Sequence, residues 1–212
     1  SATGPADLWF TFMSQTTHWD GTGWTAWPVS GVSALSAVVL GAGAPRLVGD
    51  RRVYVFGTSG WAAESGAPSA VTALVPGIGD ESWATVEVIT PPTITTQLWH
   101  RDAASWSNVT GWPGGDFHCV EPTAHGQASF VADDGLRTFD GTTWSTVPVT
   151  APAGLGACAL HGGRGWGFAG SGRMAYFDGT SWTLFPGYQR RDASPTQSLV
   201  VGPAGRIRGG VT

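Results

Sequence analysis

The chain has 212 residues, of which 42% are hydrophobic and 12% charged, and its formal net charge is -4. This composition indicates one folded domain, 1–212, and argues against a disordered chain. No basic cluster is present, which argues against nucleic acid as a partner. No apolar run reaches the roughly 18 residues of a spanning helix, so membrane insertion is not expected.

A five-residue pattern that ends in tryptophan recurs five times along the chain. The copies are Asp20-Gly-Thr-Gly-Trp24, Gly57-Thr-Ser-Gly-Trp61, Asp102-Ala-Ala-Ser-Trp106, Asp140-Gly-Thr-Thr-Trp144 and Asp178-Gly-Thr-Ser-Trp182. Their tryptophans lie 37, 45, 38 and 38 residues apart. A period of about 40 residues, with strand-forming segments around a tight turn, is typical of the blades of a β-propeller.

The first repeat, about 1–30, lacks an innermost strand, because its strand at 7–12 aligns with the second strand of the other repeats. A candidate for the missing strand is the apolar run 196–201, within the C-terminal segment 194–203. Residues 1–6 and 204–212 are then tails. Sharing a blade between the two ends of the chain removes free sheet edges. The alternative is an open fragment of a longer propeller.

The second repeat, 31–66, predicts four strands, although its turn has Gly57 in place of the aspartate. The third repeat, 67–113, has an innermost strand at 69–75, and its seven extra residues are expected between 77 and 93. The strands of the second repeat are expected at 35–40, 45–48, 52–56 and 60–63.

The last two repeats, 114–150 and 151–187, each contain four short apolar or alternating runs. The runs are 117–120, 128–132, 136–139 and 144–147, then 155–160, 165–169, 173–177 and 181–185. Cys119 and Cys158 fall on the innermost runs of these consecutive repeats, so either a disulfide or two buried thiols is compatible with the sequence. The chain is therefore predicted to be an all-β, five-bladed β-propeller of four-stranded antiparallel blades, closed by its C-terminal strand.

The string His18-Trp-Asp-Gly-Thr-Gly-Trp24 resembles the hairpin of small fucose-binding propeller lectins, and five blades in a chain of this size resemble the tachylectin-like lectins. The resemblance implies a secreted carbohydrate-binding protein with glycan sites in the clefts between blades. Those lectins bind fucose through an arginine and a glutamate on middle strands beside the hairpin tryptophan. No repeat here carries that pair, so fucose specificity is not expected.

Candidate ligand residues fall into two groups. The hairpin tryptophans can stack on sugar rings, although a residue that recurs in each blade also serves to pack blades together. Positions that differ between repeats, and aromatics outside the repeat, are better candidates for recognition. Arg101 replaces an aromatic residue and either reaches Asp102 or offers a hydrogen-bonding fork to a cleft. The predicted ligand-binding residues are His18, Trp19, Trp24, Trp83, His100, Arg101, Trp106, Trp144, Tyr176 and Trp182.

Catalysis finds little support in the sequence. Asp116, His118, Glu121 and His161 are the acids and histidines near the predicted inner strands, and opposing blades offer no second carboxylate. No Cys-x-x-Cys pair or Gly-x-Ser-x-Gly elbow occurs. We therefore expect no catalytic residues, metal or cofactor.

The sequence favours a secreted protein that binds glycans or glycoproteins. The alternative is a non-catalytic protein-interaction or receptor-binding module of a larger extracellular assembly. A glycoside-processing enzyme is the least favoured function.

Overall fold

The computed structural model describes residues 2–4, 7–36, 38–102, 104–114, 117–132, 134–156, 158–170, 173–189, 199–201 and 207–209. These residues form strands and connecting turns, and no helix among them has the length and hydropathy of a membrane span. The chain divides into two compact units, 1–114 and 115–212. The prediction of an all-β, five-bladed β-propeller is confirmed, with blades 1 to 3 in the first unit and blades 4 and 5 in the second.

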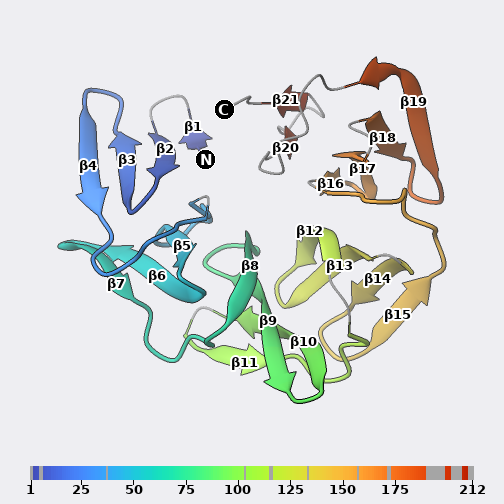
Figure 1. Ribbon diagram of the computed structural model, residues 1–212, viewed down its shortest axis with the longest axis horizontal. Coiled ribbons are helices and arrows are strands. Elements are labelled where there is room, and N and C mark those ends of the chain that lie inside the picture. The colour runs from blue at the N-terminus through green and yellow to red at the C-terminus, as the bar shows by residue number, and fades with distance from the viewer. Residues whose placement is uncertain are drawn as a thin grey trace. The chain divides into compact units, whose positions relative to one another are not determined.

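The first unit contains three antiparallel blades, whose strands follow one another in chain order (Figure 1). Blade 1 consists of β1 (Ala2–Gly4), β2 (Asp7–Phe12), β3 (Gln15–Trp19) and β4 (Trp24–Pro28). Blade 2 consists of β5 (Arg46–Gly49), β6 (Arg52–Gly57) and β7 (Gly60–Ala63), and Leu35 and Val39 add isolated bridges to β5. Blade 3 consists of β8 (Val71–Pro76), β9 (Ser82–Thr90), β10 (Thr93–Arg101) and β11 (Trp106–Asn108).

The second unit contains the two remaining blades and a short C-terminal hairpin. Blade 4 consists of β12 (Phe117–Ala124), β13 (Gln127–Ala132), β14 (Gly135–Phe139) and β15 (Trp144–Val147). Blade 5 consists of β16 (Cys158–His161), β17 (Arg164–Phe168), β18 (Arg173–Phe177) and β19 (Trp182–Gln189). The hairpin pairs β20 (Leu199–Val201) with β21 (Ile207–Gly209).

The innermost strand of blade 1 comes from the N-terminus, so the prediction that residues 1–6 are a tail is wrong. Ala2 in β1 pairs with Leu8 in β2, and the sheet of blade 1 consists of β1 to β4. Of the run predicted to fill this place, 196–198 lie outside the described residues and 199–201 pair with β21 instead. Only two residues separate β1 from β2, so their pairing closes a much shorter loop than pairing with the far end would.

The Asp-Gly turns form as predicted. In blade 4, Oδ1 of Asp140 accepts the backbone N–H groups of Thr142 and Thr143 at 2.8 Å each. Gly141 has φ 99°, a value that glycine adopts without strain. In blade 1 the hydroxyl of Thr22 and the backbone N–H groups of Thr22 and Gly23 lower the pKa of Asp20 to about 2. In blade 5 the backbone N–H groups of Thr180 and Ser181, with their hydroxyls, lower the pKa of Asp178 to about 2.

Blade 3 carries the extra length of the repeat in one hairpin. Strands β9 and β10 have nine residues each and pair along their whole length, from Ser82 opposite Arg101 to Thr90 opposite Thr93. The tip, Pro91-Pro92, falls inside the predicted segment 77–93.

Apolar clusters hold neighbouring blades together inside each unit. Trp9 and Val29 of blade 1 pack with Leu47 of blade 2, and a second cluster joins Val53 of blade 2 to Ala84 of blade 3. In the second unit a disulfide joins Cys119 on β12 to Cys158 on β16, with 5.2 Å between the Cα atoms. Of the two states that the sequence allowed, a disulfide or two buried thiols, the structure contains the disulfide.

Candidate functional site

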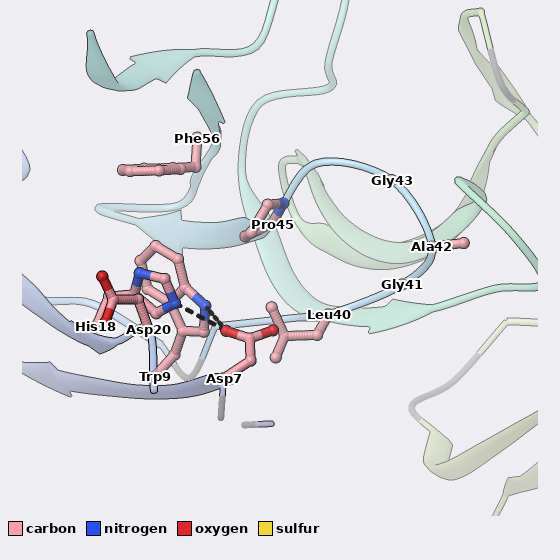
Figure 2. A pocket seen from close by; sticks show the side chains of 10 residues that line it. All are labelled: Asp7, Trp9, His18, Asp20, Leu40, Gly41, Ala42, Gly43, Pro45 and Phe56. Atoms are coloured by element: carbon pink, nitrogen blue, oxygen red, sulfur yellow. Dashed lines mark hydrogen bonds and ion pairs between the residues drawn. The ribbon is translucent and has the colours of Figure 1, made fainter. Parts of the chain in front are cut away.

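A cavity of about 500 Å³ lies between blade 1 and the inner part of blade 2 (Figure 2). It combines aromatic rings, two carboxylates and a glycine-rich loop, which is the mixture of apolar walls and few polar groups found in ligand sites. We call it the blade 1–2 pocket. Its lining residues are Asp7, Trp9, His18, Asp20, Leu40, Gly41, Ala42, Gly43, Pro45 and Phe56.

The wall on blade 1 is built from an acid, a tryptophan and a histidine. Trp9 on β2 pairs with His18 on β3, and their rings stack with centroids 4.1 Å apart and planes 14° apart. Oδ1 of Asp7 accepts the Nε1–H of Trp9 at 2.9 Å and lies 2.8 Å from Nε2 of His18 (Figure 2). The carboxylate therefore fixes both rings, while its side chain and that of His18 stay 32% and 24% exposed.

The opposite wall comes from blade 2. Phe56 on β6 meets Trp9 edge to face, with ring centroids 5.0 Å apart. The backbone of Val39 and Arg46 pairs at the base of a loop, 40–45, that forms the rest of this wall. The pocket is thus walled by aromatic rings, loop residues and the carboxylates of Asp7 and Asp20.

Two glycines let this loop press against blade 3. A Cβ on Gly41 would lie 2.7 Å from the carbonyl oxygen of Gly79, and one on Gly43 would lie 1.7 Å from Oδ1 of Asp80. The N–H of Ala42 donates to the Gly79 carbonyl at 2.8 Å. A larger residue at position 41 or 43 would push the loop toward the pocket.

Behind the loop lies a cluster of four charged residues, which we call the four-charge cluster: Arg46, Glu64, Asp80 and Arg101. Nε of Arg46 and Nε of Arg101 donate to Oε1 of Glu64 at 3.1 and 2.7 Å. The Nη1 atoms of the two arginines donate to the Asp80 carboxylate at 2.8 and 3.0 Å. The side chains of Arg46, Glu64 and Arg101 are only 5%, 9% and 11% exposed, so these bonds are largely shielded from water.

The pKa of Asp80 reflects two opposing effects. Burial raises the pKa of this carboxyl group, but hydrogen bonds and charge from Arg46 and Arg101 outweigh burial and hold the pKa below its ordinary value. Asp80 is therefore an anion that balances the two guanidinium groups.

The guanidinium of Arg101 is bonded on several sides, while its predicted ligand role stays a prediction. Its guanidinium reaches both the backbone carbonyl of Asp102, at 2.9 Å, and the acids of the cluster, so it is held within the protein. Beside it, Nε1 of Trp106 donates to Oε2 of Glu64 at 3.2 Å. An arginine, a glutamate and a hairpin tryptophan thus meet between blades 2 and 3, although the glutamate comes from the neighbouring repeat.

The other predicted residues of the first unit lie in different surroundings. Trp24 is 54% exposed and packs beside Trp19, with centroids 5.3 Å apart. Trp83 is fully buried against the ring of His100, at 4.2 Å. Of the predicted residues in this unit, His18 lines the blade 1–2 pocket, and Trp19, Trp24, Trp83, His100, Arg101 and Trp106 do not.

The predicted residues of the second unit make ring contacts. Trp144 lies 4.9 Å from Phe139, and Trp182 lies 5.2 Å from Phe177, measured between ring centroids. Tyr176 contacts Trp166 on the adjacent strand at 4.7 Å. Both hairpin tryptophans of this unit thus pack on the aromatic residue that precedes the motif, and the ligand role of Trp144, Tyr176 and Trp182 stays a prediction.

One arrangement occurs twice in the first unit. We define the blade 1 triad as Asp7, Trp9 and His18, and the blade 3 triad as Glu81, Trp83 and His100. In each, an acid precedes a tryptophan by two residues and the tryptophan pairs with the histidine across the sheet. The acid-to-Nε2 distance is 2.8 Å in blade 1 and 3.4 Å in blade 3.

Sequence reasoning missed five contributors to the pocket: Asp7, Trp9, Asp20, Phe56 and the loop 40–45. The recurring acid-x-Trp spacing at 7–9 and 81–83 was a signal for Asp7. Phe56 and the loop had no comparable signal, because their role depends on which faces of two blades meet.

The acids and histidines considered for catalysis are engaged or not brought together. Glu121 accepts the backbone N–H groups of Gly162 and Gly163 at the β16–β17 turn. Cys119 and Cys158 are consumed by the disulfide, and Asp116 lies outside the described residues. Within the described part of the chain, no group of three or more His, Cys, Asp or Glu side chains is placed to hold a metal ion.

No protein-family model and no curated protein matches the chain. Several solved structures do match. A gluconolactonase from Xanthomonas campestris aligns with a TM-score of 0.61 at 13% identity, over 96% of this chain and 79% of that one. YCF48 bound to a D1 peptide aligns with a TM-score of 0.58 at 12% identity, over 94% and 68% of the two chains. The Pan2 WD40 domain of Neurospora crassa aligns with a TM-score of 0.52 at 14% identity, over 96% and 82%.

At these identities the likeness shows the propeller fold alone. None of the three proteins is named as a lectin, so they give the resemblance to propeller lectins no support.

Proposed function

We propose that the protein is a non-catalytic carbohydrate-binding module and that the blade 1–2 pocket holds one sugar unit of a glycan. The observation that carries this proposal is the carboxylate of Asp7, held beside the stacked Trp9–His18 rings and facing Phe56 across an open cavity. Sugars combine hydroxyl donors with an apolar ring face, so a carboxylate beside an aromatic wall suits them.

The charge of the pocket supports a neutral or hydroxyl-rich ligand. Asp20 stays ionised because turn hydrogen bonds hold its pKa at about 2, and Asp7 adds a second carboxylate to the lining. Two acidic groups at one pocket disfavour an anionic sugar and offer acceptors to hydroxyl groups.

Secretion belongs to the same proposal. A disulfide between Cys119 and Cys158 persists in oxidising compartments and is rare in the cytosol. Glycans and glycoproteins, the expected partners, are accessible to a protein in such a location.

A protein-interaction module is the second candidate, and a different observation favours it. Phe10, Phe12, Met13 and Trp24 of blade 1 are each more than half exposed. Exposed apolar groups of this size within one blade are typical of protein contact surfaces. YCF48, which has the same fold, is bound to a peptide. The tryptophans outside the repeat do not decide between the candidates, because none of the described ones is strongly exposed.

A glycan array followed by calorimetric titration of the matching monosaccharides tests the proposal. We expect binding in the millimolar range or tighter, and Asp7→Asn and Phe56→Leu should each weaken it by about tenfold or more. Phe139→Leu is the matched control, because Phe139 holds the same repeat position in blade 4. A silent array, with flat titrations up to about 10 mM, would refute glycan binding.

A further inference from the structure

A second cavity, of about 570 Å³, lies between blades 2 and 3 and is separate from the blade 1–2 pocket. Apolar side chains line much of it, including the buried Val48 and Val71 and the partly buried Leu35 and Leu74. Four exposed polar residues also line it: Ser36, Asp50, Arg51 and Thr72. It is therefore an apolar hollow with one cation, Arg51, and one anion, Asp50, at its surface, and the Asp50 carboxylate is hydrogen-bonded to Ser33.

Arg51 occupies a backbone position that favours glycine. Asp50 and Arg51 connect β5 to β6 with φ values of 44° and 65°. Two successive left-handed residues define the hairpin turn for which Asp-Gly and Asn-Gly are the preferred sequences. Hydrogen bonds offset the left-handed backbone conformation at Asp50, because its carboxylate accepts the N–H and Oγ–H of Ser33 at 2.9 and 2.8 Å.

The backbone contacts of Arg51 do not require an arginine. Its carbonyl oxygen accepts the N–H of Val71 at 3.0 Å, which docks the turn on blade 3. A glycine at position 51 would keep that bond and adopt the same φ without strain. The guanidinium is what the arginine adds.

That guanidinium is only partly used by the protein. Nη2 contacts the carboxylate of Glu87 and lies 3.4 Å from the carbonyl oxygen of Ala70. The side chains of Arg51 and Glu87 are 48% and 28% exposed, and ion pairs this open to water add little stability. Among the described residues, none accepts a hydrogen bond from Nε or Nη1 of Arg51.

We propose that this cavity binds a small carboxylate with an apolar body and that Arg51 is its anion-recognition residue. The unused Nε–H and Nη1–H donors can hold a carboxylate in a two-bond geometry, while Leu35, Val48 and Val71 contact the apolar part. Strained backbone at a ligand-facing position is typical of functional sites, where a side chain is kept despite its cost. Glu87 competes with the ligand for the same guanidinium.

Benzoate and benzamide are suitable probes, because they match in size and shape and differ in charge. We expect calorimetric titration of the full chain to give a millimolar Kd for benzoate and at least about tenfold weaker binding of benzamide. Arg51→Gly should weaken benzoate binding by about tenfold or more while the Tm stays equal or rises by about 2–4 °C. Glu87→Gln should strengthen benzoate binding several-fold, a gain that a purely structural ion pair would not produce.

Met13→Gly is the matched control. Met13 is also a non-glycine residue with positive φ, 51°, and it lies in the β2–β3 turn, outside the cavity lining. Its replacement should relieve strain and leave benzoate binding unchanged. A flat benzoate titration, or unchanged binding by Arg51→Gly, would overturn the proposal. A large loss of Tm in Arg51→Gly would also overturn it, since the arginine would then be structural.

Discussion

Glu64→Gln tests how much the four-charge cluster contributes to the first unit. Glu64 is 9% exposed and accepts bonds from Nε of Arg46, Nε of Arg101 and Nε1 of Trp106, at 3.1, 2.7 and 3.2 Å. Glutamine keeps the shape of the side chain but removes its charge, and its amide hydrogens face an arginine donor. Two guanidinium groups are then left with Asp80 as their only carboxylate in the cluster.

The expected loss is large because the cluster is shielded from water. Removing one partner of a buried ion pair costs about 3–5 kcal/mol, since the opposite charge stays desolvated without compensation. For a chain of this size each kcal/mol lowers Tm by about 2–4 °C, so Glu64→Gln should lower Tm by roughly 10 °C.

Differential scanning calorimetry of Glu64→Gln beside Glu87→Gln measures this effect. Glu87 pairs with Arg51, but both side chains are well exposed, so losing this pair should cost at most about 1 kcal/mol. Equal Tm losses in the two variants would refute the argument that burial makes the four-charge cluster strong. A Glu64→Gln protein with the Tm of the wild type would refute this argument as well.

Three further changes test other parts of the fold. Replacing Cys119 and Cys158 together by alanine removes a cross-link over a sequence separation of 39 residues, so calorimetry should show a loss of about 4 kcal/mol; an unchanged Tm would contradict this. Gly43→Ala places a Cβ 1.7 Å from a carboxylate oxygen of the four-charge cluster and should lower Tm in thermal melts, whereas Gly23→Ala, with open space around it, should not. The lowered pKa of Asp178, about 2, means that its turn bonds stabilise the fold above about pH 4 and are lost as pH falls toward 2. The Tm difference between wild type and Asp178→Ala should therefore be full at about pH 6 and shrink near pH 2; a difference that is constant with pH would exclude the carboxylate as its cause.

The blades were predictable because their signals are local. An Asp-Gly turn is stabilised by backbone N–H groups within the turn itself, as the bonds of Asp140 to residues 142 and 143 show. Five consecutive residues are therefore enough to predict the turn. The inner strand of blade 1 was not predictable in this way. Ala2–Gly4 is three residues long and contains no apolar alternation, and it is a strand because β2 offers it an edge.

The candidate site was only partly predictable, because its contacts join separate repeats. His18 was identified from its variation between repeats, and it lines the pocket. Arg101 was left with two possible roles, since Glu64 and Asp80 precede it by 37 and 21 residues. Phe56 occupies a repeated aromatic position, and only the packing of blade 2 on blade 1 turns its ring toward Trp9.

The two triads show why repeated chemistry does not by itself make a ligand site. Both contain the same three residue classes in the same register, with ring centroids 4.1 and 4.2 Å apart. The acid of the blade 1 triad is 32% exposed and that of the blade 3 triad 9%, so only the first carboxylate is substantially open to solvent. Loop 40–45 lines the pocket beside Asp7, and its Gly43 lies against Asp80 in the connection between β8 and β9. The same triad chemistry therefore gives an open carboxylate in blade 1, where it borders the pocket, and a buried one in blade 3.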